Sequence, residues 1–372
     1  MSMRPLTVLF AGGGTAGHLL PAMATEEQLH AMLSGSGFDQ LNAIYLATKS
    51  GAELPLLKKA HATFRLVPKT DFPRKLNGDL LSFLPRLIIA VVKTRKTIKS
   101  LHVDVVVGFG GYVALPAYCA AKLAKTPLVI HEANALPGLA NRVGKWMATQ
   151  AFSNFSIPEW NDAPAIGLPI RQSIADISKL NVSQREECKS AARAHFGLEP
   201  NRKTMLIFGG SLGAAKVNEV IAQALDEIVA RGFQILHAVG AGNSLPLRSE
   251  GYHPVPYIDQ MDQAFLAADL VVARSGAGTC AEIEASALPA VLIPLPIGNG
   301  EQLLNAKALA HRGGVQIIKN ESLSQDALMS AISTLESEGF TKTSDRESAA
   351  AILAMSICQL ASERKRSRKR TA

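Results

Sequence analysis

The sequence predicts an α/β protein made of two tandem Rossmann-like domains facing a cleft, and three observations lead to this fold class. Short apolar runs of strand length alternate with segments of helix length, a pattern typical of parallel sheets covered on both faces. The segment TVLFAGGGTAGH, which starts at Thr7, is similar to TMLIFGGSLGAA, which starts at Thr204. The length of 372 residues also suits about two domains.

The first domain is predicted over residues 1–165. Strands are expected at 6–11, 43–47, 103–107 and 128–130, and helices at 19–33 and 113–124. The strands are predominantly apolar, which favours central positions in a parallel sheet. The segment 158–169 is rich in Pro and predicts a hinge near Ala165, where a cleft should lie.

The second domain, predicted over residues 166–344, repeats this pattern. A strand at 203–208 leads into a glycine turn at 209–213 and a helix at 214–229, with further strands at 234–238, 270–273 and 290–293. A last helix is expected over 345–363. The basic tail 364–372 has nothing apolar to bury, so the sequence predicts that it is disordered.

The charge and cysteine content exclude several functions. The net charge is +8, but six of these charges belong to the tail, so the rest of the chain is not a broad polyanion binder. Its four cysteines form no C-x-x-C pair, which argues against a disulfide scaffold or zinc ribbon and fits the cytosol. The longest uncharged run, 105–121, is too short and too glycine-rich to span a bilayer, and the N-terminus lacks the features of a secretory signal.

Glycine-rich turns are the first candidate site. The turn 12–17 follows a strand and opens a helix, so its backbone N–H groups and the helix dipole can bind an anion such as phosphate. The alternative is that the glycines serve only the tight turn. A dinucleotide site also needs an acid at the end of the second strand, where the sequence has Ala47-Thr48-Lys49-Ser50. NAD is therefore disfavoured, and NADP less so.

Two further turns extend this hypothesis to a diphosphate ligand. The turn 209–213 adds backbone donors and the Ser211 hydroxyl, and the break 274–279 opens a helix that carries Glu282. An acid near a helix N-terminus often does no more than interact favourably with the helix dipole. Beside phosphate-binding turns, Glu282 could instead accept hydrogen bonds from a ribose diol.

Two histidines are candidates for chemistry. His18 lies at the start of the first helix, where the positive helix end would lower its pKa and keep it neutral as a proton acceptor. His131 and Glu132 follow the strand 128–130 at the edge where open α/β sheets bind ligands. The alternatives are a structural His18 and a loop-closing His131–Glu132 pair, while Asn134 could bind sugar hydroxyls.

A basic and apolar segment is the candidate membrane contact. The patch residues are Arg74, Lys75, Leu76, Leu80, Leu81, Phe83, Leu84 and Arg86, followed by a basic helix face at Lys93, Arg95, Lys96 and Lys99. The alternative is a core helix with a solvated face. The sequence shows no metal-ligand cluster, nucleophile elbow, Walker lysine or aromatic-basic pattern for nucleic acid.

Taken together, these motifs resemble the MurG family of bacterial glycosyltransferases, from Leu6 to about Glu363. The residues that carry the resemblance are 13–18, 110–113, 131–134, 167–171, 209–214, 274–282, Gln302 and Asn305. The resemblance implies a GT-B fold whose last helix returns to the N-terminal domain. It also implies transfer of N-acetylglucosamine from UDP-GlcNAc to an undecaprenyl-diphosphate-linked muramyl pentapeptide, in peptidoglycan synthesis on the cytoplasmic face of the cell membrane.

The resemblance also assigns roles to residues. It implies that Ser211, Thr15, Ala16 and Gly17 line the diphosphate, that the Ile258 backbone meets the uracil, and that Glu282 binds the ribose. Gln302 and Asn134 would contact the sugar, and Arg171 would stand where the two domains meet. The donor site would also include Ala277, Gly278, Thr279, Cys280 and Ala281. From its position, we expect His18 to be the catalytic base that deprotonates the acceptor hydroxyl.

The chain departs from the commoner family pattern at four positions, namely Ala16, Leu168, Leu212 and Glu301. Leu168 and Leu212 each replace a side-chain amide, and Glu301 adds a charge near the expected sugar site. We expect no cofactor, no metal in the chemistry and no nucleic-acid partner. The remaining alternatives are another GT-B UDP-sugar transferase, a UDP-GlcNAc epimerase and a non-catalytic nucleotide-binding module.

Overall fold

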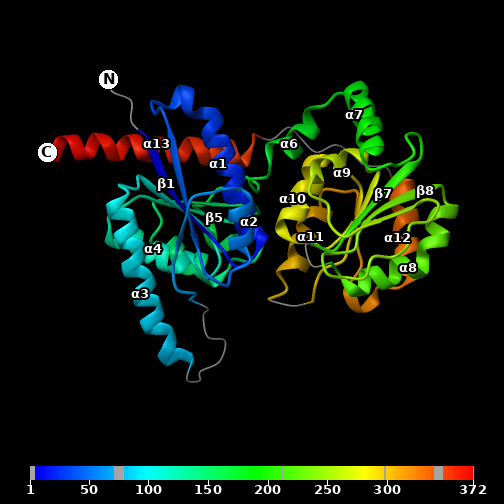
Figure 1. Cartoon of the computed structure of the whole chain (residues 1–372), viewed down its shortest axis with the longest axis horizontal. Helices are drawn as coiled ribbons and strands as arrows, with labels where there is room; N and C mark the ends of the chain where they lie inside the picture. The colour runs from blue at the N-terminus through cyan, green and yellow to red at the C-terminus, as the bar shows by residue number, and fades with distance from the viewer. Residues whose placement is uncertain (1–4, 71–78, 211–212, 297–298, 339–346, 372) are drawn as a thin grey trace. The chain divides into compact units, whose positions relative to one another are not determined.

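The computed structural model describes residues 5–70, 79–210, 213–296, 299–338 and 347–371. The chain forms two compact units (Figure 1). The N-terminal unit comprises Met1–Arg171 together with Glu347–Ala372, and the C-terminal unit comprises Gln172–Arg346. The division thus falls after Arg171, whereas the sequence analysis placed it at Ala165.

The N-terminal unit contains a six-stranded parallel sheet in the order β3-β2-β1-β4-β5-β6. Its strands are β1 (Leu6–Gly12), β2 (Leu41–Ala47), β3 (Phe64–Leu66), β4 (Val105–Gly110), β5 (Leu128–Glu132) and β6 (Gln150–Ser153). Its helices are α1 (Ala16–Ser36), α2 (Glu53–Lys59), α3 (Asp79–Ser100), α4 (Ala114–Leu123), α5 (Leu139–Lys145), the 3₁₀ turn η1 (Pro158–Trp160) and α13 (Ala349–Thr371).

Alternate residues of β1 supply two core layers, because neighbouring side chains of a strand point to opposite faces. Val8 and Phe10 pack in one layer with residues of α1 and α13. Leu9 and Ala11 pack in the other with residues of α3 and α4. All seven residues of β1 are buried, which explains why its sequence is apolar apart from Thr7.

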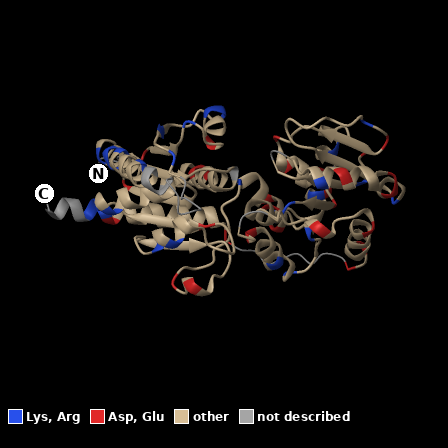
Figure 2. Cartoon of the chain, turned by 90° about the horizontal axis from the view of Figure 1, so that it is seen from below, with Lys and Arg blue, Asp and Glu red and all other residues tan. Residues whose placement is uncertain are grey.

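The last helix belongs to the N-terminal unit, where α13 packs against α1 (Figure 1). The expectation of a disordered tail from residue 364 is wrong, because α13 continues to Thr371. Arg364 anchors this part of the helix by donating hydrogen bonds to the carbonyls of Val103 (2.7 Å) and Asp104 (2.9 Å). Figure 2 shows basic residues along the final turns of α13 that precede its grey end.

The C-terminal unit contains a second six-stranded parallel sheet, in the order β12-β11-β10-β7-β8-β9. Its strands are β7 (Lys203–Phe208), β8 (Phe233–Ala238), β9 (Tyr252–Val255), β10 (Leu270–Ala273), β11 (Ala290–Leu292) and β12 (Val315–Ile317). Its helices are α6 (Gln172–Ala175), η2 (Asp176–Lys179), α7 (Val182–His195), α8 (Ala215–Ala230), α9 (Met261–Ala267), α10 (Ala277–Ser286), α11 (Glu301–Ala310), η3 (Asn320–Ser322) and α12 (Gln325–Glu338).

The two sheets share one topology, because the second order, taken from its other edge, repeats the first. In each sheet the first strand of the unit lies in the centre, and three strands extend on one side of the sheet and two on the other. The internal repeat predicted from the sequence therefore covers whole domains. None of the helices in the described ranges is both long and apolar enough to cross a membrane.

Candidate active site

The glycine turns of the N-terminal unit lie at the carboxyl ends of its central strands, as the parallel topology requires. β1 ends at Gly12 and β4 at Gly110, and the two strands are neighbours. We call residues 12–15 the first turn and residues 110–113 the second turn. The Gly13 N–H donates to the Gly110 carbonyl across 3.4 Å, so the two turns are in direct contact.

His18 lies at the third position of α1 and faces its own N-cap residue. Thr15 has the extended backbone of an N-cap, but its hydroxyl makes no cap hydrogen bond. The hydroxyl oxygen instead lies 3.2 Å from Nδ1 of His18. On its other side the ring meets the second turn, because a Cβ on Gly110 would lie 3.3 Å from Nε2 of His18. A larger residue at position 110 would therefore crowd the ring.

The pKa of His18 is lower than its ordinary value. Burial is the main cause, since it disfavours the charged imidazolium, and a hydrogen bond with the Gly13 backbone opposes the shift. The sequence analysis predicted this direction but attributed it to the helix dipole. A neutral ring with a free lone pair at neutral pH can accept a proton.

Glu53 is a site residue that the sequence analysis missed. It is the first residue of α2 and is fully buried. One carboxylate oxygen accepts from the Thr48 N–H (2.9 Å) and hydroxyl (3.1 Å), and the other accepts from the Gly14 N–H and the Tyr112 hydroxyl (both 3.0 Å). The only signal in the sequence is an acid two residues after Gly51, a common pattern at helix starts.

Glu132 closes the loop that follows β5. Its carboxylate accepts from the N–H groups of Asn134 (2.9 Å) and Gly138 (3.0 Å) and from the Asn141 side chain (2.9 Å). Burial raises the pKa of Glu132, and these hydrogen bonds only partly oppose that shift. The loop-closing alternative for Glu132 is therefore confirmed, and the Asn134 side chain also lies 3.4 Å from its carboxylate.

His131 has a structural environment. It lies inside β5 rather than after it, is fully buried, and its Nε2 is 2.7 Å from the Gly167 carbonyl. Burial lowers the pKa of His131 to about 4, and the hydrogen bond to Gly167 opposes the shift. A neutral ring that donates from Nε2 holds the segment after β6 to the sheet.

In the C-terminal unit, the glycine turn after β7 is held by backbone contacts. Gly213 has a φ of +74°, and a Cβ there would lie 2.1 Å from the Val239 carbonyl oxygen. Helix α8 starts directly after the turn, without a side-chain cap or an acid in its first turn among the described residues. Ser211 and Leu212 lie outside the described residues.

The third glycine-rich segment leads into α10. Its N-cap Gly276 has no side chain, and a Cβ on Gly276 or Gly278 would meet open space. Buried Arg274 donates to the Ile293 carbonyl (3.1 Å) and so ties the segment to the end of β11. Glu282 lies on α10, half-buried, in the second helical turn. The same helix carries Ala277, Thr279, Ala281 and the buried Cys280, whose pKa burial raises to about 12.

The first turn of α11 contacts the same region. Gln302 accepts the Leu295 N–H with its side-chain oxygen (3.0 Å), and its carbonyl accepts from the Ser275 hydroxyl (2.9 Å). Glu301 accepts the Asn299 N–H at 2.8 Å, so this departure from the family pattern serves the helix start. Ile258 is buried in the C-terminal unit, while Arg171 is the last residue of the first segment of the N-terminal unit, directly before the C-terminal unit begins.

The structure describes only part of the predicted membrane patch. Arg74, Lys75 and Leu76 lie outside the described residues, as do the side chains of Leu80 and Leu81. Phe83 does not belong to an exposed patch, because only 7% of it is exposed. Leu84 and Arg86 are exposed. The apolar surface continues along α3 through Ile88, Ile89 and Val92, which the sequence analysis did not include.

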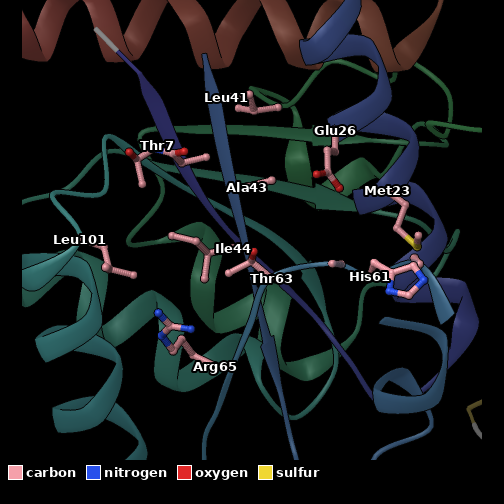
Figure 3. Close-up of a pocket in the computed structure, with 13 residues that line it drawn as sticks. Thr7, Met23, Glu26, Leu41, Ala43, Ile44, His61, Thr63, Arg65 and Leu101 are labelled. Atoms are coloured by element: carbon pink, nitrogen blue, oxygen red, sulfur yellow. The ribbon is translucent and has the colours of Figure 1, made fainter. Parts of the chain in front are cut away.

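A cavity of about 440 Å³ lies elsewhere in the N-terminal unit. Figure 3 shows Met23 and Glu26 from α1 and Leu41, Ala43 and Ile44 from β2 around it. Thr7, Leu41 and Ala43 lie in the amino-terminal halves of their strands, whereas the glycine turns follow the carboxyl ends. The cavity is therefore separate from the candidate site. Within the described ranges, no three His, Cys, Asp or Glu residues are grouped to hold a metal ion.

Comparison with known proteins supplies a family. The model of the glycosyltransferase family 28 N-terminal domain matches residues 8–153, and that of the family 28 C-terminal domain matches residues 204–360. A relative from Mycobacterium sp. strain KMS is 43% identical over 324 residues, which cover 86% of this chain and 84% of its own. Its name is UDP-N-acetylglucosamine--N-acetylmuramyl-(pentapeptide) pyrophosphoryl-undecaprenol N-acetylglucosamine transferase.

Solved structures agree with this result. The crystal structure of Acinetobacter baumannii MurG is 27% identical, has a TM-score of 0.66, and matches 96% of this chain and 95% of its own. The UDP-GlcNAc 2-epimerase of Methanocaldococcus jannaschii has a TM-score of 0.60 at 11% identity, covering 96% of this chain and 100% of its own. This second likeness shows a common fold alone.

Proposed function

This chain belongs to the MurG family within glycosyltransferase family 28, and we propose that it transfers N-acetylglucosamine from UDP-GlcNAc to the undecaprenyl-diphosphate-linked muramyl pentapeptide. The observation that carries this proposal is a relative of that activity at 43% identity over 86% of the chain. The two parallel sheets with glycine turns at their carboxyl ends support it, since each turn opens a helix whose N-terminus favours an anion.

The reaction is a single displacement with inversion at the sugar. The acceptor hydroxyl oxygen forms a bond to the anomeric carbon while the bond from that carbon to the diphosphate oxygen breaks. The electron pair leaves with UDP, and the hydroxyl proton passes to His18. With Nδ1 protonated and turned to the Thr15 oxygen 3.2 Å away, Nε2 carries the lone pair that takes this proton.

The departing UDP is stabilised by the C-terminal unit. The N-termini of α8 and α10 have no side-chain cap among the described residues, so their N–H groups suit the diphosphate. Glu282 of α10 binds the ribose and the Ile258 backbone binds the uracil. Gln302 contacts the sugar through its amide nitrogen, because its side-chain oxygen accepts the Leu295 N–H. These helix ends take the place of a metal ion in the reaction.

A transfer assay tests the function. Purified protein is incubated with UDP-GlcNAc and a lipid-linked muramyl pentapeptide, with and without EDTA, and the disaccharide product and free UDP are measured. The expected result is stoichiometric product and UDP, unchanged by EDTA. UDP-ManNAc in place of a disaccharide would instead show an epimerase. Binding of UDP-GlcNAc without turnover would show a non-catalytic module.

The exposed face of α3 is the membrane contact in this proposal. Leu84, Ile88 and Val92 are spaced by four residues and therefore share one helix face, and they are 55%, 61% and 61% exposed. Exposed Arg86, Arg95 and Lys96 lie on the same helix. Apolar side chains can enter the headgroup region of an anionic membrane while the basic groups bind its phosphates. The enzyme would then work at the cytoplasmic surface, where its lipid-linked acceptor lies.

Vesicle flotation tests this contact. A variant with Ile88→Ser and Val92→Ser should lose most of its binding to vesicles of phosphatidylglycerol and phosphatidylethanolamine, while its melting temperature changes little. The control carries Val182→Ser and Leu247→Ser, two apolar residues of the C-terminal unit that are 83% and 90% exposed. Equal flotation of both variants would contradict the assignment.

A further inference from the structure

We propose that Glu53 is a positioning residue for the transfer reaction, whose buried carboxylate fixes the two glycine turns that hold the His18 ring. This inference rests on the proposed function, in which His18 is the base. The hydrogen bonds of the Glu53 carboxylate go to Gly14, Thr48 and Tyr112 rather than to the ring. It acts through the first turn, which precedes α1, and through the second turn, which packs on His18.

The carboxylate joins three segments that are far apart in the sequence. Its donors are the Gly14 N–H in the first turn, the Tyr112 hydroxyl in the second turn and the Thr48 N–H after β2. These residues are 39, 59 and 5 positions from Glu53. A single buried group therefore sets the distance between both turns and the end of β2.

The donor set demands a carboxylate rather than an amide. Each oxygen of Glu53 accepts one backbone N–H, from Thr48 on one side and from Gly14 on the other. A backbone N–H cannot reverse its role as a hydroxyl can. In a glutamine, the amide NH₂ would face one of these two N–H groups in either orientation. Glu53→Gln must therefore break one side of the link while keeping the side-chain size.

The surrounding glycines fit this carboxylate closely. A Cβ on Gly51 would lie 2.1 Å from one Glu53 oxygen and 2.2 Å from the other, and the φ of Gly51 is not in the left-handed region. The turns are equally tight, since a Cβ on Gly111 would lie 1.8 Å from the Gly13 carbonyl oxygen. Gly51→Ala would thus displace the carboxylate without removing it and without backbone strain.

The ionised state of Glu53 agrees with this geometry. Burial raises the pKa of Glu53, but hydrogen bonds from its own backbone, from Gly14 and Thr48 and from the Tyr112 hydroxyl outweigh it and leave the pKa below its usual value. A negative charge behind the first turn also occupies the Gly14 N–H. That N–H group is therefore used to shape the turn and is not available to a substrate phosphate.

The test compares Glu53→Gln and Gly51→Ala with the control Glu26→Gln. Glu26 is another carboxylate of the N-terminal unit that accepts from a tyrosine hydroxyl, that of Tyr45, but it lines the cavity opposite the turns. Measurements are kcat, KM for both substrates, UDP affinity, melting temperature and hydrogen exchange of peptides from the two turns. Both test variants should lower kcat about tenfold to hundredfold, as expected for a misplaced catalytic group, with UDP affinity within about twofold.

Hydrogen exchange separates this inference from the proposed function. In both test variants residues 12–18 and 110–113 should exchange faster than in the wild type and in Glu26→Gln, whether or not the protein transfers sugar. Unchanged exchange and kcat in folded Glu53→Gln would overturn the inference. Loss of transfer in the wild type would instead count against the proposed function alone.

A double variant tests whether Glu53 acts through His18. If it does, Glu53→Gln should lower kcat by less than about twofold when it is added to His18→Ala, because both changes then remove the same catalytic contribution. An additional loss of tenfold or more in that background would show that Glu53 acts elsewhere, and would refute its role as a positioning residue for His18.

Discussion

The two units of this chain agree at the amino ends of their central strands and differ at the carboxyl ends. In the N-terminal unit the Thr7 N–H donates to the Asp104 carboxylate (3.0 Å), and the Asp104 N–H donates to the Thr7 carbonyl (2.8 Å). In the C-terminal unit Thr204 and Asp269 make the same pair of bonds, at 2.7 Å and 2.8 Å. The repeat thus preserves a pair of hydrogen bonds between the first strand of each unit and its neighbour.

At the carboxyl ends of the strands, different contacts hold the glycine turn in each unit. The first turn of the N-terminal unit is held by the Glu53 carboxylate and places His18 at the third position of its helix. In α8 that position is Val217, which is 1% exposed, and the turn before it packs on the Val239 carbonyl. The comparison teaches that the two units share their hydrogen bonds at the amino ends, whereas at the carboxyl ends the same helix position holds a histidine in one unit and a buried valine in the other.

The largest expected effect concerns a property that the units share, a buried histidine in a strand beside the centre of the sheet. Burial lowers the pKa of both His131 in β5 and His237 in β8 to about 4, from 6.5 in the unfolded chain. The unfolded chain therefore binds more protons, so stability is complete above about pH 6.5 and falls as the pH drops towards 4. Each histidine should contribute a loss of about 3 kcal/mol.

Urea unfolding at a series of pH values measures this loss. His131→Gln and His237→Gln should each reduce the slope of stability against pH between about 4 and 6.5, by a similar amount. If only one of the two variants changed this slope, the two buried histidines would not be equivalent.

The next effect distinguishes the turns by their glycines. Gly111→Ala and Gly213→Ala each force a Cβ against a carbonyl oxygen at a positive φ, so each should lower the free energy of unfolding by about 3 kcal/mol. In the protein that remains folded, Gly111→Ala should lower kcat, whereas Gly213→Ala should weaken UDP binding.

Gly232→Ala is the matched control for these two variants. Its φ is +87°, but a Cβ there would meet nothing within 4 Å, so it should cost only the backbone strain of about 1 kcal/mol. Calorimetry measures the stability of the three variants, and titration with UDP measures their affinity for UDP. If Gly213→Ala left UDP affinity unchanged, the C-terminal turn would not be the diphosphate site.

The third effect sets His18 against its counterpart on α8. His18→Ala should lower kcat about 10²-fold, because it removes the proposed general base, with little change in UDP affinity or stability. Val217→Ala should lower stability by about 1–3 kcal/mol, because it leaves a cavity in the core. Steady-state kinetics and urea unfolding of both variants measure the contrast. Normal turnover in His18→Ala would remove this residue from the role of base.

The smallest effect tests the pair of Thr–Asp hydrogen bonds that the two units share. Asp104→Asn should cost about 1 kcal/mol, since an amide oxygen can still accept the Thr7 N–H. Asp269→Asn should cost about 2 kcal/mol, because Asp269 also binds Arg193 (2.5 Å) and Lys189 (3.0 Å). Chemical unfolding measures both, and kcat should stay unchanged. A larger loss of stability in Asp104→Asn than in Asp269→Asn would contradict this ranking.

Several parts of the site were accessible from the sequence, because they depend on short segments. The glycine turns, the helix that carries His18 and the helix that carries Glu282 follow directly from an apolar strand and the glycines after it. Glu53 was not accessible, because its donors come from three separate segments. Phe83 was misplaced for a related reason, since its burial depends on which side of α3 faces the sheet.

The sequence by itself determined two α/β domains, their internal repeat and the family, because strand and helix periodicity and ordered motifs are properties of neighbouring residues. Only the tertiary structure decided that α13 continues past residue 363, held by Arg364 on the carbonyls of Val103 and Asp104. It also decided that one buried carboxylate joins two glycine turns. Both depend on contacts between segments distant in the chain, which no local pattern encodes.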